Sequence, residues 1–307
     1  MDVIDVNHLT FRYGRREVLR DLDLSVPRGA LYALLGPNGS GKTTLLQLLT
    51  GLRRAQSGTA SILGVPCSRL TMRDRARIGY VAEGQVLPGW MRLEQLERYL
   101  APLYPTWDAA LARDLRQRFE LDPRRVIGTL SRGETMKAAL LCALAPRPEL
   151  LLMDEPFTGM DAVVKDELVR GLLESSGSEG WTVLLCSHDI GELELLADWV
   201  GFLADGRMRL SVPMETLRER FRHVDIVAGA ADLPLEGTPD RNWLRVERSG
   251  RRMEAVLDAA EMGNIEQMLM TRFPAAERIE VRPATLREVF VALAKHQPTG
   301  ATTEVAA

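Results

Sequence analysis

Gly36-Pro37-Asn38-Gly39-Ser40-Gly41-Lys42-Thr43-Thr44 is the stretch that decides the fold of this chain. It matches the phosphate-binding pattern G-x-x-x-x-G-K-[ST] at every position. Apolar residues 31–35 before it predict a buried strand, and leucine-rich residues 45–49 after it predict a helix. In that context the loop's N–H groups and the helix N-terminus surround a polyanion. We therefore predict that this loop binds nucleotide phosphates, with Lys42 at the β- and γ-phosphates and the Thr43 hydroxyl at Mg²⁺.

The overall composition is that of a globular protein with a substantial core. Hydrophobic residues make up 46% of the 307 residues, enough for one large domain or two. The net charge of −3 gives no electrostatic reason to expect a nucleic-acid partner. We see no apolar run near the roughly 18 residues of a membrane span, and no secretory leader. The three unclustered cysteines indicate buried thiols in a reducing, cytosolic setting.

Strand patterns dominate the first part of the chain and return after residue 149. Residues 2–35 alternate apolar and polar positions, which predicts two or three antiparallel strands leading into the loop. The continuous apolar runs 150–154 and 182–186 are typical of central parallel strands, with a helix predicted between them over 161–173. Further strands are predicted at residues 59–64 and 77–82, and as a closing hairpin near 200–203 and 207–210.

Residues 92–148 and 213–297 have sequence patterns that predict separate structural units. Leucines at helical spacing from about 92 to 148 predict a helical subdomain, about 86–148, inside a domain spanning 1–212. Residues 213–297 predict a small α+β domain, and we expect the tail 298–307 to be disordered. In the small domain, strands are predicted over 224–227, 243–248, 253–257 and 278–282, and helices over 262–273 and 285–295.

Carboxylates and a histidine follow the two apolar strands. Asp154 and Glu155 end the first, and His188 follows the second. Parallel strands carry such residues to one sheet edge, where ligands bind in open α/β sheets. One carboxylate there can hold the Mg²⁺ water shell, and a second can polarise an attacking water. His188 at the same edge is predicted to touch a γ-phosphate or that water.

The segment Leu130-Ser131-Arg132-Gly133-Glu134 adds a more specific signal. Together with the residues above, over about 1–210, it resembles the signature of the ATP-binding subunit of ABC transporters. The resemblance implies an α/β fold of the P-loop NTPase, ABC ATPase type. That fold has a RecA-like sheet core, an antiparallel β subdomain and a helical subdomain, with the small α+β appendage added here. The resemblance rests on Tyr13, residues 36–44, 130–134, 150–155, Thr158-Gly159-Met160-Asp161 and His188.

The resemblance also implies roles residue by residue. Two copies would sandwich two ATP molecules head to tail, each between one phosphate loop and the opposite chain's Ser131 and Gly133. Glu155 would be the general base and His188 the γ-phosphate switch, while Thr43 and Asp154 would serve Mg²⁺. Tyr13 would stack on adenine, and Asp161 would signal across the dimer. Ser131 and Glu134 also fit a capping box, and Ser131 can cap its helix and contact the other chain's nucleotide at the same time. The implied nucleotide-binding set is Tyr13, Gly36, Pro37, Asn38, Gly39, Ser40, Gly41, Lys42, Thr43, Thr44, Ser131, Gly133, Glu134 and Asp161.

Two departures from the family pattern matter. Gly79-Tyr80-Val81-Ala82-Glu83 stands where the family commonly has glutamine at the last position, and Gln85 follows two residues later. Either side chain could serve the metal, and we favour Glu83, whose oxygens can coordinate Mg²⁺. Arg132 and Glu134 replace a common glycine and a common glutamine. Glu83 in its loop together with Leu130-Ser131-Arg132-Gly133 is similar to the ABC-2-like bacterial branch, and so is Pro283–Phe290.

These features predict an ATPase subunit that uses ATP and Mg²⁺ and powers a separate integral membrane permease of ABC-2 type, for export. We expect a homodimer, no nucleic-acid partner and a cytoplasmic location, peripheral on the inner face of the cell membrane. A soluble ABC ATPase acting on nucleic acid or the ribosome is the alternative, and the net charge of −3 and single cassette weigh against it. A small-molecule kinase would share the phosphate loop but not residues 130–134 or His188.

Overall fold

The computed structural model describes residues 2–157, 165, 181–188, 190, 191, 193–229, 242–260 and 262–295. The chain divides into two compact units, Met1–Met208 and Arg209–Ala307. The predicted helix over 161–173 and the predicted tail from Pro298 lie outside the described residues, apart from Lys165. Among the described helices, none is long and apolar enough to cross a membrane.

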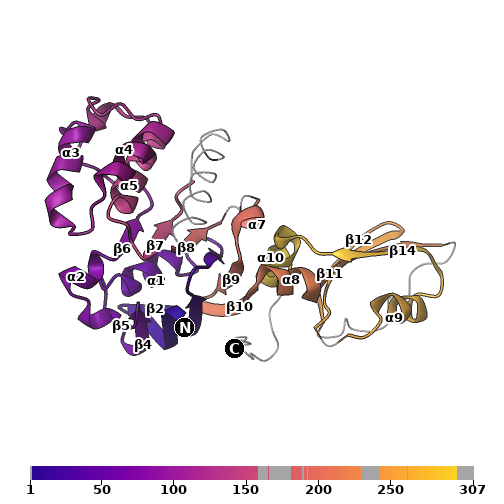
Figure 1. Cartoon of the computed structure of the whole chain (residues 1–307). Coiled ribbons are helices and arrows are strands. Elements are labelled where there is room, and N and C mark those ends of the chain that lie inside the picture. The colour runs from indigo at the N-terminus through magenta and orange to yellow at the C-terminus, as the bar shows by residue number, and fades with distance from the viewer. Residues whose placement is uncertain are drawn as a thin grey trace. The chain divides into compact units, whose positions relative to one another are not determined.

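A six-stranded sheet forms the centre of the first unit, in the order β10-β9-β3-β8-β7-β6 (Figure 1). The neighbours β9-β3, β3-β8, β8-β7 and β7-β6 pair in parallel, as continuous apolar runs predict. Every residue of β3 and β7 is buried. The strands are β3 (Leu31–Leu35), β6 (Ile78–Val81), β7 (Leu150–Asp154), β8 (Thr182–Ser187), β9 (Trp199–Ala204) and β10 (Arg207–Pro213).

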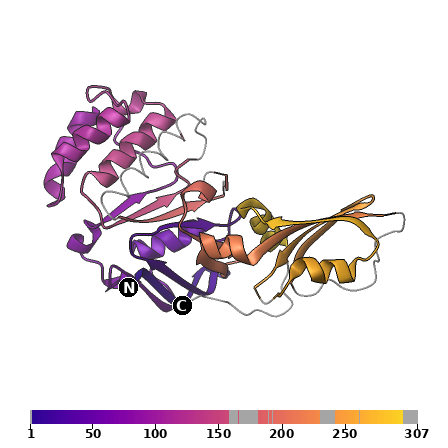
Figure 2. The same cartoon turned by 45° about the vertical axis from the view of Figure 1, so that its right-hand side comes forward.

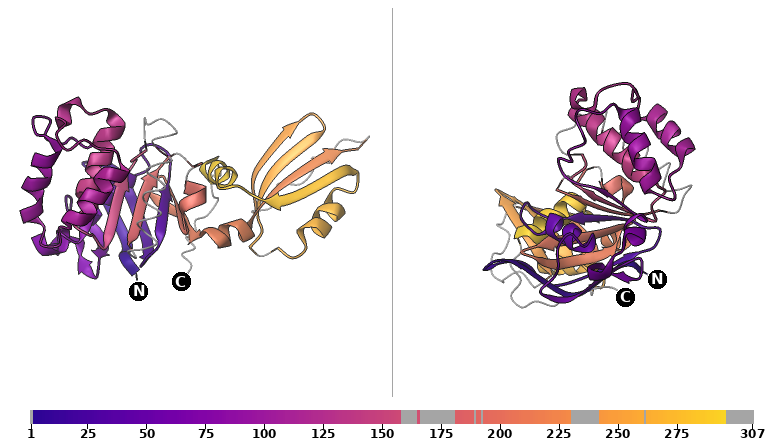
Figure 3. Two further views of the ribbon diagram at one scale, coloured as in Figure 1. Left: turned by 45° about the horizontal axis from the view of Figure 1, so that its top comes forward. Right: turned by 90° about the vertical axis from the view of Figure 1, so that its left-hand side faces the viewer.

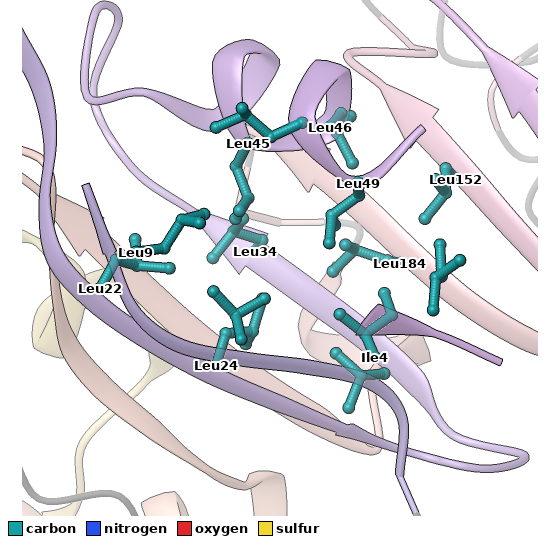
Figure 4. Packing of buried hydrophobic residues seen from close by; sticks show 14 of the residues in the cluster. Ile4, Leu9, Leu22, Leu24, Leu34, Leu45, Leu46, Leu49, Leu152 and Leu184 are labelled. Atoms are coloured by element: carbon teal, nitrogen blue, oxygen red, sulfur yellow. The ribbon is translucent and has the colours of Figure 1, made fainter. Parts of the chain in front are cut away.

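An antiparallel sheet in the order β2-β1-β4-β5 packs against the helix that follows the phosphate loop. That helix is α1 (Lys42–Leu49). Figure 4 shows its Leu45, Leu46 and Leu49 facing Leu34 and Leu184 of the central strands, in one core with residues of the antiparallel sheet. This core fixes the start of α1 against the end of β3. The strands are β1 (Asp2–Tyr13), β2 (Arg16–Pro27), β4 (Ser57–Ile62) and β5 (Val65–Pro66), as predicted within residues 2–64 apart from the short β5.

Helices α3, α4 and α5 form a separate layer of the first unit, visible in all views (Figures 1, 2 and 3). This confirms the predicted helical character of residues 92–148. Asp108 caps α4, accepting hydrogen bonds from Ala110 N at 2.8 Å and Leu111 N at 2.9 Å. The helices are α2 (Met72–Arg75), α3 (Leu93–Leu100), α4 (Ala109–Arg118), α5 (Arg132–Leu144) and α7 (Leu193–Leu196), with 3₁₀ turns at Cys67–Arg69, Ala101–Leu103 and Ile127–Thr129.

The second unit is a four-stranded antiparallel sheet, in the order β12-β13-β11-β14, with helices. Leu269 in α9 and Phe273, directly after this helix, join the apolar core of the sheet. Figure 2 shows α9 along one face of the sheet. Ser249 pairs with Arg252, so Gly250 and Arg251 form the tight turn between β12 and β13. The elements are α8 (Met214–Arg220), β11 (Phe221–Ala228), β12 (Trp243–Ser249), β13 (Arg252–Asp258), α9 (Ile265–Arg272), β14 (Ala276–Pro283) and α10 (Leu286–Lys295).

Candidate functional site

The phosphate-binding loop joins the end of β3 to the start of α1. Gly41 has φ +113°, in the left-handed region, and a Cβ there would lie 2.6 Å from Leu19 Cδ2. A Cβ on Gly36 would lie 2.3 Å from the Leu203 carbonyl oxygen. Both positions therefore require glycine, because any side chain would force the loop away from the strands beneath it.

Lys42 and Thr43 are the first two residues of α1, directly after this loop. The Lys42 side chain is buried, and its Nζ donates to the Gly36 carbonyl oxygen at 2.7 Å. The same ammonium lies 3.5 Å from Glu155 Oε1, in a pair whose two side chains are 6% and 8% exposed. Thr43, by contrast, is exposed on the cleft. The loop thus presents one desolvated cation and one accessible hydroxyl.

A cleft of about 710 Å³ lies over the loop, within the 300–1,000 Å³ usual for ligand pockets. Tyr13, at the end of β1, is 41% exposed. Arg16 and Val18 in β2 also line the cleft, and the sequence reasoning missed both. Their place within five residues of Tyr13, on the next strand, was the available signal. The lining residues are Tyr13, Arg16, Val18, Asn38, Gly39, Gly41, Lys42, Thr43, Thr44, Glu83, Glu155 and His188.

Asp154 ends β7 as a buried carboxylate, 1% exposed, and neither carboxylate oxygen makes a hydrogen bond of normal geometry. Burial raises the pKa of this carboxyl, and the charges of Glu155 and Glu83 raise it further. The nearby Thr43 hydroxyl and Lys42 ammonium lower the pKa in part. A buried carboxylate without partners next to an accessible hydroxyl fits a hard divalent cation such as Mg²⁺.

No trio of His, Cys, Asp or Glu side chains within the described ranges is arranged to hold a metal ion alone. Mg²⁺ usually binds through one or two protein oxygens together with substrate phosphates and water. The donors at Asp154 and Thr43 agree with that mode. The residues present therefore fit a magnesium ion that arrives with a nucleotide.

Glu155 follows β7 with φ 47°, a left-handed conformation that is costly for a residue with a side chain. Its N–H donates to the Cys186 carbonyl oxygen at 2.9 Å, which ties the kink to β8. Its Oε2 lies 2.8 Å from His188 Nδ1, and accepts from Ser187 Oγ at 3.3 Å. The kink thus turns the Glu155 carboxylate towards both β8 and Lys42. Ser187 is a further contact that the sequence reasoning missed.

The parallel register explains why these side chains meet. Leu35 pairs with Ser187, and Asp154 pairs with Cys186, so β3, β7 and β8 end at the same edge. The structure therefore brings together Lys42, Glu155 and His188 from three segments separated by more than 30 residues each.

Ser131 and Glu134 form the predicted capping box at the start of α5. Ser131 Oγ accepts from the Glu134 N–H at 3.2 Å, and Glu134 Oε2 accepts from the Ser131 N–H at 2.7 Å. The Ser131 backbone bond lowers the pKa of Glu134, and Arg125 also contacts this carboxylate. Ser131, Gly133 and Glu134 are absent from the lining of the cleft of their own chain.

Glu83 and Gln85 differ in position. Glu83 lines the cleft, whereas Gln85 Oε1 accepts a hydrogen bond from the Ala82 N–H at 3.1 Å. The assignment of Glu83 to the metal remains a prediction that this geometry favours. Asp161 and residues 158–160 lie outside the described residues.

Comparisons with known proteins agree with this geometry. A family model described as "ABC transporter" matches residues 19–158. The sulfate/thiosulfate import ATP-binding protein CysA of Yersinia pseudotuberculosis is 35% identical over 226 residues, covering 70% of this chain and 62% of that protein. The lantibiotic transport ATP-binding protein SrtF of Streptococcus pyogenes is 31% identical over 226 residues, covering 72% of this chain and 96% of that protein.

A solved ATP-binding subunit of an ABC transporter has the same fold, with a TM-score of 0.65 and 28% identity over 71% of this chain and 92% of that one. The predicted fold class is thus confirmed. The matched span contains the phosphate loop, the signature at Ser131 and the carboxylates of β7. This chain belongs to the ATP-binding proteins of the ABC transporter family.

Proposed function

We propose that this chain hydrolyses ATP to power a separate membrane permease. The observation that carries the proposal is the meeting of Lys42, Glu155 and His188 over the phosphate loop, beside the buried carboxylate of Asp154, whose oxygens make no hydrogen bond of normal geometry. Phosphoryl transfer to water needs positioning and electrostatic stabilisation more than covalent chemistry, and this cleft offers both.

Entry of ATP would rearrange the ion pairs at the site. The γ-phosphate would compete with Glu155 for the Lys42 ammonium, now 3.5 Å from Oε1. That competition frees Oε1 to accept a proton from an attacking water, while His188 Nδ1, 2.8 Å from Oε2, holds the carboxylate in place. Mg²⁺ would supply charge stabilisation of the phosphate oxygens. Thr43, Asp154 and Glu83 would hold it.

The position of the signature supports a second copy as partner. Ser131 is exposed at a helix N-terminus, where N–H groups favour anions, yet it does not line its own chain's cleft. Two copies arranged head to tail would place Ser131 and Gly133 on the other chain's nucleotide. The chain carries a complete set of these motifs, so we propose a homodimer with two working sites. Asp161 would signal across it.

We base the proposed permease type, transport direction and location on the family and on the departures noted above. The relatives are named for transport, and CysA is named for import. We nevertheless propose an ABC-2 type permease and export, because Glu83, the Leu130–Gly133 signature and Pro283–Phe290 resemble that branch. The chain would then bind peripherally to the inner face of the membrane, and nucleic acid would play no part.

Mg²⁺-dependent phosphate release tests the proposal, measured on the purified chain with and without liposomes holding the membrane protein encoded beside it. We expect release that Lys42→Ala abolishes and that the membrane protein changes. Absence of release in both settings would refute the ATPase. Release that is indifferent to every neighbouring membrane protein would refute the permease.

A further inference from the structure

The ring of Tyr13, which lines the cleft, contacts two residues that do not line it, Arg53 and Phe11. The Arg53 guanidinium carbon lies 4.7 Å from the centroid of the Tyr13 ring. Phe11 meets the same ring edge to face, with centroids 4.9 Å apart. Both distances are typical of favourable ring contacts.

Gln47 of α1 links the arginine to the tyrosine. Arg53 Nε donates to Gln47 Oε1 at 2.5 Å, and the Arg53 N–H donates to the Gln47 carbonyl oxygen at 3.1 Å. The Tyr13 hydroxyl donates to the same Oε1 at 3.5 Å, a long hydrogen bond. Arg53 is therefore anchored to the helix that begins at the phosphate loop, and its guanidinium lies against the Tyr13 ring.

Tyr13 and Arg53 have different surroundings. Tyr13 lines the cleft and is 41% exposed, whereas neither Arg53 nor Gln47 is among the residues that line it. The guanidinium thus lies over one face of the ring, while the ring itself still lines the cleft. An exposed tyrosine at a strand end would otherwise sample several rotamers.

We propose that Arg53 is a positioning residue for nucleotide binding, which fixes the Tyr13 ring so that a base can stack on it. The inference rests on the proposed function, since it takes ATP as the ligand of the cleft. A fixed ring loses less conformational entropy when the base stacks. Arg53 would therefore act on the base and leave the phosphates unaffected.

Two ligands distinguish an effect on base binding from an effect on phosphate binding. They are ATP and inorganic tripolyphosphate, which has the phosphates but no base. Calorimetry would give the Kd of each for the parent, Arg53→Ala and Arg54→Ala. Arg54 is the matched control, because it is exposed and carries the same charge one residue away. We expect Arg53→Ala to weaken ATP binding by about two- to fivefold and to leave tripolyphosphate unchanged. Arg54→Ala should move neither, and in turnover assays Arg53→Ala should raise KM with kcat unchanged.

A Tyr13→Ala background completes the test. There the Arg53→Ala effect on ATP should vanish, because the residue acts through the ring. Equal weakening of both probes would overturn the inference in favour of an effect on α1 and the phosphate loop. An unchanged ATP Kd, or an undiminished effect without Tyr13, would overturn it as well. A parent that binds tripolyphosphate but not ATP would refute the proposed function, and this inference with it.

Discussion

Replacing Asp154 by asparagine should make the nucleotide-free protein more stable while it damages Mg²⁺-dependent function. The carboxylate is 1% exposed, makes no hydrogen bond of normal geometry, and lies near the charges of Glu155 and Glu83. Because burial raises its pKa, ionising this carboxyl in the folded protein costs free energy until a cation joins it. The asparagine amide removes that charge and keeps the volume of the side chain.

The expected gain follows from the cost of a buried charged group without partners. A buried polar group without partners costs about 1–3 kcal/mol and a charged group costs more; the new amide keeps the polar part of this cost, so we expect a net gain of about 1–2 kcal/mol. In a unit of this size, the gain raises Tm by about 2–8 °C. Thermal unfolding in EDTA at pH 7 measures it, and Asp2→Asn, at an exposed position, controls for net charge.

Two further measurements test whether the buried charge of Asp154 causes this difference in stability. Because the pKa of Asp154 is raised, its charge destabilises the folded state most at pH values above the raised pKa, and this penalty disappears as the pH falls towards the ordinary pKa of an aspartate. The advantage of Asp154→Asn should therefore shrink in acid. Mg²⁺ with ATP should raise the Tm of the parent more than that of the variant. A variant less stable than the parent in EDTA at pH 7 would refute the reasoning.

Three other predictions concern the metal loop, the dimer and the second unit. Glu83→Ala should weaken hydrolysis across a Mg²⁺ titration at saturating ATP more than Gln85→Ala does, and the reverse order would assign the role to Gln85. Mixing Lys42→Ala with Gly133→Asp subunits should restore one intact site, seen as hydrolysis or as trapped ATP; heterodimers that do neither would remove the trans role of Ser131. Burial raises the pKa of Glu288, but Arg282, Thr285 and His223 lower it to about 2, so its stabilisation is present above about pH 4.5 and fades towards pH 2. Glu288→Gln should therefore speed amide exchange of β11 at pH 7, by about 1 kcal/mol in opening free energy once solvent screening of this partly exposed pair is counted, and equal exchange in both proteins would contradict this.

Much of the fold could be predicted because local patterns and tertiary packing agree here. The strands at 150–154 and 182–187 follow from apolar runs that only a doubly covered parallel sheet can bury. The helix at 265–272 was predicted three residues early, because the Asn264 side chain caps it by accepting from the Gln267 N–H at 3.0 Å. The strand order could not be predicted, since β3 lies between β8 and β9, both far along the chain.

The candidate site, like the fold, could be predicted from the sequence only in part. Motif spacing placed Lys42, Asp154, Glu155 and His188 at one edge. It could not show the left-handed Glu155 or its 3.5 Å approach to Lys42, which depend on the register between strands. Arg53 was equally hidden, because its effect on Tyr13 runs through a ring contact 40 residues away in sequence.

ATP turnover and nucleotide retention by Glu155→Gln test most directly whether Glu155 is the general base. The amide keeps the shape of the side chain and its reach to His188 but cannot take a proton from water. We expect ATP binding to persist, turnover to fall by about 10²–10⁴-fold, and a closed dimer with bound ATP to accumulate. Hydrolysis near the parent rate would show that another group activates the water, and would contradict the proposed mechanism.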